Sequence, residues 1–124
     1  MTLSVLIIED EIIIGLLLSD LLADMGHEVC AIVTTVAEAV AAAAAHRPDL
    51  MIVDVNLGRE SGIAAADAIC AVSNIPCIFV SGDDAILKTL TARGEVIPKP
   101  YQQRHLERAI AETTGARRGS ARSL

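Results

Sequence analysis

The amino-acid sequence predicts one doubly wound α/β domain, in which five helices cover a five-stranded parallel sheet. The chain has 124 residues, which is the length of one domain and too short for two independent cores. Hydrophobic residues make up 52% of it, so a disordered chain is excluded. Short apolar runs alternate with longer helical segments, and strands this apolar are typical of parallel sheets joined by right-handed crossovers.

In the N-terminal half, residues 3–8 are nearly all apolar and predict a buried strand. Residues 11–25 predict a helix that ends at Gly26. Its expected core stripe follows the spacing of one helix face: Ile14, Leu17, Leu18, Leu21 and Met25. A second strand is expected at residues 28–33 and a helix at 36–46, which starts at a capping box of Thr35 and Glu38.

The C-terminal half repeats this alternation of short apolar runs and helical segments. The expected elements are a strand at 50–53, a polar loop at 58–62, a helix at 63–72, a strand at 77–80, a helix at 84–92, a strand centred on 96–97, and a helix at 103–114. No apolar run reaches the length of about 18 residues that a membrane span needs, so we expect no membrane association.

The charge distribution argues against nucleic-acid binding. Sixteen acids and ten bases give a net charge of −6, and the last ten residues carry three arginines and no acid. The acidic body would repel a phosphate backbone, and two aromatic residues, Phe79 and Tyr101, are too few for a base-stacking platform. We therefore expect a folded domain over residues 1–114 and a basic, flexible tail over 115–124.

The three cysteines lack the spacing of a zinc site. Cys30, Cys70 and Cys77 form no C-x-x-C pair, and the chain has no signal peptide. An odd number of cysteines without secretion signals is typical of a reducing compartment, so the sequence indicates a cytoplasmic protein.

Five side chains suited to phosphoryl chemistry follow the predicted strands. Glu9 and Asp10 end the first strand, Asp54 the third, Ser81 the fourth and Lys99 the fifth. The carboxyl ends of parallel strands form the functional crevice of such sheets, so we expect these groups to lie together. Three ionised carboxylates repel one another, and either protonation of one of them or a hard cation such as Mg²⁺ relieves that repulsion.

This set of groups matches the requirements of an aspartyl phosphate. A carboxylate can attack phosphorus as a nucleophile, while a metal ion and a lysine neutralise the charge on the phosphoryl oxygens. A nearby hydroxyl can donate a hydrogen bond to the product phosphoryl group.

Four sequence blocks resemble the receiver domain of bacterial two-component response regulators, and in particular the stand-alone chemotaxis receiver. They are VLIIEDE at 5–11, DLMIVDVNLG…SG at 49–62, IFVSG at 78–82 and PKPY at 98–101. The resemblance covers residues 3–114 and implies a flavodoxin-like fold with strand order 2-1-3-4-5.

The resemblance also implies roles for the strand-end residues. Asp54 would accept a phosphoryl group from a phosphohistidine of a histidine kinase or a histidine phosphotransfer protein. Lys99 would pair with the phosphoryl group, the Ser81 hydroxyl would move to meet it, and the Lys99–Pro100 peptide bond would be cis. The implied Mg²⁺ ligands are the side chains of Glu9, Asp10 and Asp54 and the backbone carbonyl of Asn56.

The sequence departs from the family pattern at three places. Gly58 stands where the family often has proline, which we expect to loosen the loop. Val96 stands where the family has its switch aromatic, and Tyr101 does not occupy that position, so we expect switching through the helix at 84–92. Asp83 and Asn56 occupy positions that tune dephosphorylation in the family, so the lifetime of the phosphorylated state is open.

Two surfaces are candidates for partner binding. Ile12, Ile13 and Leu16 fall outside the expected core stripe, and the resemblance implies that they, with Tyr101, dock the phosphodonor. The face formed by the fourth helix, fifth strand and fifth helix is a candidate partner or homodimer surface; its residues include Lys88, Arg93, Tyr101 and Arg104.

The leading hypothesis is a single-domain response regulator that is not an enzyme beyond its own phosphorylation and dephosphorylation. Since one receiver and a short tail account for the 124 residues, we expect the receiver itself to contact a downstream protein or to relay phosphate. The alternative is a pseudo-receiver, an interaction module that works without phosphorylation. A phosphatase with an aspartyl nucleophile is less favoured, because Asn56 stands where such enzymes place a second carboxylate.

Overall fold

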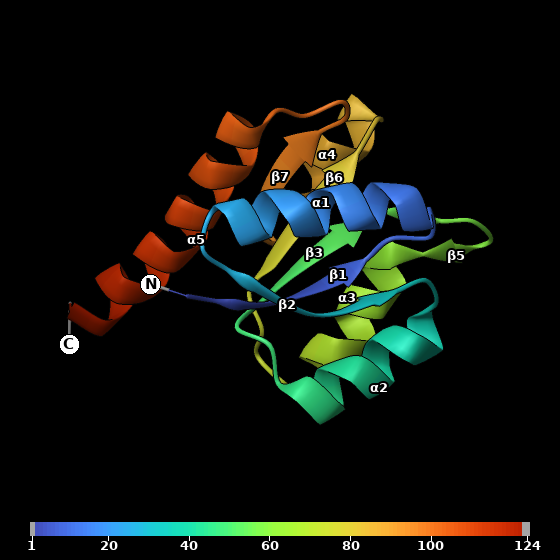
Figure 1. The fold of residues 1–124 in the computed structure, drawn as a ribbon, viewed down its shortest axis with the longest axis horizontal. Coiled ribbons are helices and arrows are strands. Elements are labelled where there is room, and N and C mark those ends of the chain that lie inside the picture. Colours follow the sequence, from blue (N-terminus) through green and yellow to red (C-terminus); the bar gives the residue numbers. More distant parts are fainter. Residues whose placement is uncertain (1, 123–124) are drawn as a thin grey trace.

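Five parallel strands form the central sheet. In the computed structural model, which describes the backbone of residues 2–122 and the side chains of residues 2–114, their order is β2-β1-β3-β6-β7 (Figure 1). Their bounds are Ser4–Ile8 for β1, Glu28–Val33 for β2, Leu50–Asp54 for β3, Cys77–Ser81 for β6 and Glu95–Pro98 for β7. In sequence order this is the predicted 2-1-3-4-5 arrangement, so the expected flavodoxin-like fold is confirmed.

Five helices cover the two faces of this sheet (Figure 1). They are α1 (Ile12–Asp24), α2 (Val36–His46), α3 (Gly62–Cys70), α4 (Asp84–Leu90) and α5 (Gln103–Arg122). The first four lie within two residues of their predicted bounds, whereas α5 continues past the predicted end at residue 114. The predicted tail at 115–124 lies outside the residues whose side chains are described, and its flexibility stays a prediction.

The sheet separates two hydrophobic cores because alternate strand residues point to opposite faces. Leu6, Ile8, Met51, Val53 and Phe79 pack with α2, α3 and α4 on one face. The other face packs against α1 and α5; its strand residues are Val5, Ile7, Leu50, Ile52, Ile78, Val80 and Ile97. Burial on both faces explains why these strands show no polar alternation.

The predicted core stripe of α1 is wrong at Leu17, which is 60% exposed. Leu18 is buried as predicted, together with Gly15 and Leu22, which the predicted stripe did not include, and Ile14 is only partly buried. Gly15 lies so close to β2 that an added Cβ would be 2.8 Å from the Ile32 side chain. This close approach turns the helix toward the sheet on the Gly15 side. Because α1 is apolar on nearly every face, the residue spacing could not select that side.

A small β-hairpin replaces the polar loop predicted at 58–62. Strands β4 (Asn56–Leu57) and β5 (Glu60–Ser61) pair antiparallel around a two-residue turn of Gly58 and Arg59. Gly58 has a φ of 63°, which proline cannot adopt and which suits the first position of a tight hairpin turn. Glycine therefore closes a turn here; that it also loosens the loop stays a prediction.

Three further observations bear on the sequence predictions. The Thr35 hydroxyl accepts a hydrogen bond from the Glu38 N–H at 3.1 Å, which confirms the predicted cap of α2. Cys30, Cys70 and Cys77 are all free thiols.

Within the described part of the chain, no helix combines the length and apolar character needed to cross a membrane.

Candidate functional site

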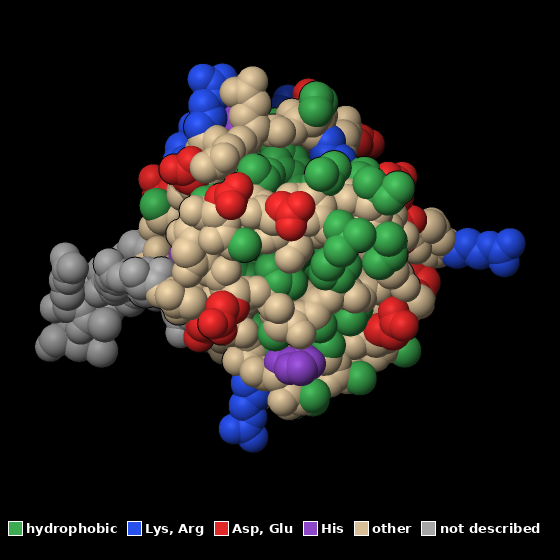
Figure 2. Space-filling view, in the orientation of Figure 1, with side chains coloured by type: hydrophobic (Ala, Val, Ile, Leu, Met, Phe, Trp, Pro, Cys, Tyr) green, Lys and Arg blue, Asp and Glu red, His purple; other side chains and the backbone are tan. Residues whose placement is uncertain are grey.

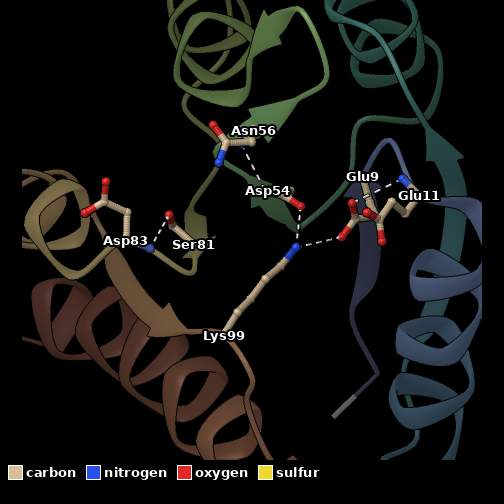
Figure 3. Close-up of polar contacts among 7 residues, drawn as sticks. All are labelled: Glu9, Glu11, Asp54, Asn56, Ser81, Asp83 and Lys99. Carbon is tan, nitrogen blue, oxygen red and sulfur yellow. Dashed lines mark hydrogen bonds and ion pairs between the residues drawn. The ribbon is translucent and has the colours of Figure 1, made fainter.

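The carboxyl ends of the strands bring four of the predicted side chains into one cluster. Figure 3 shows three of them, Glu9, Asp54 and Lys99; the fourth is Asp10. Asp54 is the last residue of β3, Glu9 and Asp10 directly follow β1, and Lys99 directly follows β7. β1 and β7 are not adjacent, yet Lys99 extends across the sheet edge toward Asp54 and Glu9. The parallel topology thus assembles a site from residues that are up to 90 positions apart.

Asp54 is buried, and both of its carboxylate oxygens have partners. Oδ1 accepts a hydrogen bond from the backbone N–H of Asn56 at 2.9 Å. Oδ2 lies 2.5 Å from the ammonium nitrogen of Lys99. These two contacts hold the carboxylate in one orientation at the end of β3.

Lys99 stands between two carboxylates, because its Nζ also lies 3.5 Å from Oε1 of Glu9. Burial alone would lower the pKa of Lys99. The hydrogen bond and charge of Asp54, together with Glu9, outweigh burial and raise this pKa above its ordinary value. The ammonium is therefore held in its charged form at neutral pH.

Glu9 is the carboxylate with the most perturbed acidity. Burial, followed by the hydrogen bond and the negative charge of Asp54, raises its pKa to about 7. The Glu11 N–H, which donates to Oε2 of Glu9 at 3.2 Å, and the charge of Lys99 oppose this shift only partly. Burial and the neighbouring Asp54 therefore outweigh the opposing effects of the Glu11 N–H and Lys99.

The acidic cluster has the donor set of a site for a hard cation. Carboxylate oxygens of Glu9, Asp10 and Asp54 lie within 4.8 Å of one another. Glu9 and Asp54 are buried, whereas Asp10 is exposed, so the cluster is open to solvent on one side. Oxygen-only ligands that leave positions for water or phosphate suit Mg²⁺. The raised pKa of Glu9 has burial as its main cause, and the hydrogen bond and charge of the nearby Asp54 carboxylate add to it.

The fifth predicted residue, Ser81, ends β6 next to the cluster but contacts a different group. Its neighbour Val80 pairs with Asp54 across the sheet. The Ser81 hydroxyl oxygen accepts a hydrogen bond from the Asp83 N–H at 3.0 Å (Figure 3). The Asp83 carboxylate in turn caps α4 by accepting from the Ala85 N–H at 2.9 Å. The Ser81 hydroxyl is thus linked to Asp83, the N-cap residue of α4.

Gly62 is a structural requirement of the site that the sequence patterns did not reveal. Its N–H donates to the Val55 carbonyl at 2.7 Å, so α3 starts directly against the end of β3. An added Cβ would lie 1.9 Å from the Asp54 carbonyl oxygen. Only glycine permits this close approach behind the acidic cluster, and no local pattern of residue types reports it.

Val96, which stands where the family has its switch aromatic, and Tyr101 lie on opposite faces of the sheet. Val96 pairs with Phe79 and packs against the core beside α4. Tyr101 packs on the other face against the core beside α1, and burial is the main cause that raises its pKa. Tyr101 therefore does not take the place that Val96 leaves without a ring.

Helix α1 presents an apolar surface beside the acidic cluster. Ile12, Ile13 and Leu16 are 51%, 72% and 53% exposed. Hydrophobic side chains gather over this helix in the space-filling view (Figure 2). A groove of about 450 Å³ lies alongside it; the residues that line the groove are Ile14, Leu17, Leu18, Leu21, Lys99, Pro100 and Tyr101.

On the candidate partner face around α4, β7 and α5, one residue, Arg93, already makes contacts within the molecule. Arg93 forms an ion pair with Asp67 of α3, and its guanidinium lies 5.7 Å from the centroid of the Phe79 ring. The Lys99–Pro100 peptide bond between β7 and α5 is cis, as predicted.

Comparison with known proteins identifies the type of domain. The family model described as the response regulator receiver domain matches residues 5–111. The transcriptional regulatory protein PdtaR of Mycobacterium tuberculosis is 38% identical over 77 residues, which cover 62% of this chain and 38% of PdtaR. The phyllosphere-induced regulator PhyR of Methylorubrum extorquens is 32% identical over 117 residues, which cover 90% of this chain and 43% of PhyR.

Solved structures give the same result. The response regulator PhyR from Brucella abortus superposes with a TM-score of 0.88 at 28% identity, over 98% of this chain and 51% of that one. The receiver domain of PhyR from Erythrobacter litoralis gives a TM-score of 0.81 at 32% identity, over 91% of this chain and 90% of that domain. The chain spans less than half the length of the curated relatives named above.

Proposed function

The chain belongs to the family of response regulator receiver domains of two-component systems, and from this premise we propose that Asp54 accepts a phosphoryl group. The donor is a phosphohistidine on a histidine kinase or a histidine phosphotransfer protein. The observation that carries the proposal is the state of Asp54: a buried carboxylate held by the Asn56 N–H and by Lys99, within an acidic cluster.

In the proposed transfer, a carboxylate oxygen of Asp54 forms a bond to phosphorus as the bond between phosphorus and the histidine nitrogen breaks. The bonding electron pair leaves with the imidazole nitrogen. Lys99 forms ion pairs with Asp54 and Glu9 before transfer. During transfer its ammonium gives up part of these contacts, pairs with the phosphoryl oxygens and neutralises their charge. The Ser81 hydroxyl donates a hydrogen bond to the transferred group.

The proposed cofactor is Mg²⁺, for which the acidic cluster has suitable ligands. Its ligands would be the carboxylates of Glu9, Asp10 and Asp54 and the backbone carbonyl of Asn56. When bound, the ion supplies positive charge that stabilises the oxygens of the phosphoryl group during transfer.

The donor is proposed to dock on α1. Ile12, Ile13 and Leu16 are exposed on α1, and Tyr101 lines the apolar groove alongside that helix. Helices of a partner can pack on such apolar surfaces. Phosphorylation would then change a contact with a downstream protein, or the phosphoryl group would be relayed onward. The surface of α4, β7 and α5 is proposed as the partner or homodimer face.

The relatives suggest the kind of output. A solved PhyR from Bartonella quintana is described as an anti-anti-sigma factor, and this chain covers 51% of it. Receiver domains are signalling proteins rather than enzymes in the ordinary sense. We accordingly propose a cytoplasmic regulator that acts through protein contacts, without direct binding to nucleic acid.

Beryllofluoride, which resembles a phosphoryl group bound to a carboxylate, tests this proposal. Wild type and Asp54→Ala are titrated with beryllofluoride in Mg²⁺ and followed by NMR amide shifts. We expect shifts around Asp54 and Ser81 in wild type and none of them in the variant. A wild type that does not respond would favour the pseudo-receiver.

A further inference from the structure

The edge of the sheet at the carboxyl ends of the strands, where the proposed phosphodonor would bind, is strongly acidic. The strand ends and the connections that follow them are residues 9–11, 34–35, 54–61, 81–83 and 99–102. These segments hold six carboxylates: Glu9, Asp10, Glu11, Asp54, Glu60 and Asp83. They hold two bases, Arg59 and Lys99. A phosphodonor carries a multiply charged phosphoryl group, so most of this edge repels it.

The two bases differ in their availability to an incoming anion. Lys99 is occupied, because it pairs with both Asp54 and Glu9. Arg59 is exposed and, within residues 2–114, forms no ion pair with any carboxylate. Its guanidinium is the positive charge on this edge that an approaching anion can pair with first.

The backbone that carries Arg59 is anchored close to the acidic cluster. Arg59 lies in the turn between β4 and β5, directly after Gly58. A Cβ built on Gly58 would lie 3.6 Å from an Asp10 carboxylate oxygen. Since neighbouring Cα atoms are about 3.8 Å apart, the long Arg59 side chain starts next to the cluster.

Both ends of the hairpin are fixed by hydrogen bonds. On one side, the Asn56 N–H donates to the Asp54 carboxylate at 2.9 Å. On the other, the Glu60 carboxylate accepts from the Val36 N–H at the start of α2, at 3.1 Å. The turn is thus presented in a defined position, which reduces the ordering cost of a contact made by Arg59.

We propose that Arg59 is a donor-binding residue that attracts and contacts the anionic phosphodonor before transfer to Asp54. The inference rests on the proposed phosphoacceptor function and adds to it a residue that acts on donor association. A guanidinium suits this role, because it stays charged and offers several N–H donors to phosphate oxygens. Arg59 does not act on the hydrolysis of the phosphoryl group once that group is bound to Asp54.

Acetyl phosphate, a small anionic donor, is the probe for the test. The second-order rate constant for phosphorylation in Mg²⁺ is measured by intact mass for wild type, Arg59→Gln and Arg59→Lys at low and high ionic strength. We expect Arg59→Gln to lower this constant about two- to tenfold at low ionic strength, and the difference to shrink as salt screens the charge. Arg59→Lys should keep most of the wild-type rate.

Two controls separate this role from a general charge effect. Arg47→Gln removes the same charge from an exposed residue between the end of α2 and the start of β3, at the amino ends of the strands, and should leave the rate constant unchanged. The first-order dephosphorylation rate should be equal in wild type and Arg59→Gln. Equal phosphorylation rates in wild type and Arg59→Gln, or an equal loss in Arg47→Gln, would overturn the inference while leaving phosphorylation of Asp54 intact. A wild type that acquires no phosphoryl group would overturn the proposed function itself.

Discussion

At the scale of single residues, the chemistry of the site follows from an imbalance of charge. Asp54 and Glu9 are buried carboxylates that share the single ammonium of Lys99, and Asp10 adds a third acid. The positions of these residues after apolar strands were enough to predict that they meet. The contacts of the Ser81 hydroxyl and the tight fit at Gly62 depend on backbone placement, which residue types do not encode.

The raised pKa of Glu9 predicts how stability depends on pH in the absence of Mg²⁺. The native carboxyl titrates near 7, against an ordinary value of 4.5. Between these values the native state holds a proton that the unfolded chain has released. The free energy of unfolding should therefore fall as pH rises from about 4.5 to about 7, by an amount on the order of 2 kcal/mol.

Urea unfolding in a chelating buffer across this range measures the effect, with Glu9→Gln as the control. The amide cannot release a proton, so the difference between wild type and variant should follow the titration of Glu9. Added Mg²⁺ needs the ionised carboxylate, so its stabilising effect should grow as pH rises through the same range. Parallel pH profiles for the two proteins would contradict this explanation.

Gly62 predicts a second effect at the residue scale. In Gly62→Ala, the new methyl group would overlap the Asp54 carbonyl and push α3 away from β3. We expect a loss of about 1–3 kcal/mol in the free energy of unfolding, together with slower phosphorylation of Asp54. Gly82→Ala is the matched control, because a Cβ there meets no atom within 4 Å. The explanation fails if both variants have the same stability.

At the scale of elements, the strands were easier to predict than the orientation of the helices. Each strand is a short apolar run ended by polar residues, and all five were found at nearly their observed bounds. The buried side of α1 was predicted only in part, because Ile12, Ile13, Leu16 and Leu17 leave no polar face to define it. The β4–β5 hairpin was missed because two-residue strands carry no periodicity.

The exposed residues of α1 lead to a prediction about partner specificity. Ile13→Asp should leave the free energy of unfolding within about 0.5 kcal/mol of wild type, because this side chain is 72% exposed. It should slow phosphotransfer from the cognate histidine kinase about tenfold, since a charge would be buried in the docked complex. Phosphorylation by acetyl phosphate, which does not dock on α1, should slow much less than transfer from the kinase.

Val72→Asp is the matched control for this prediction. Val72 is 86% exposed and follows α3, on the face of the sheet opposite α1. Rates of transfer from the kinase should therefore equal those of wild type. Slower transfer in both variants would indicate a general effect of surface charge rather than docking on α1.

At the scale of the whole molecule, topology explains why so much was predictable. Parallel strands must place all their carboxyl ends at one edge, so residues from four strands converge without any local signal that links them. The strand order, the cis Lys99–Pro100 bond and the family assignment were all expected from the resemblance that the four sequence blocks carry. The spacing of the motifs did not predict where the β4–β5 turn places the exposed Arg59, which we propose contacts the phosphodonor.

The central claim is that Asp54 accepts a phosphoryl group, and mass spectrometry tests it most directly. The chain is incubated with Mg²⁺ and acetyl phosphate, its intact mass is recorded, and the modified peptide is located. We expect a gain of one phosphoryl group on the peptide that contains Asp54, and no gain in Asp54→Asn. An unmodified wild type, or an equal gain in the variant, would contradict the claim.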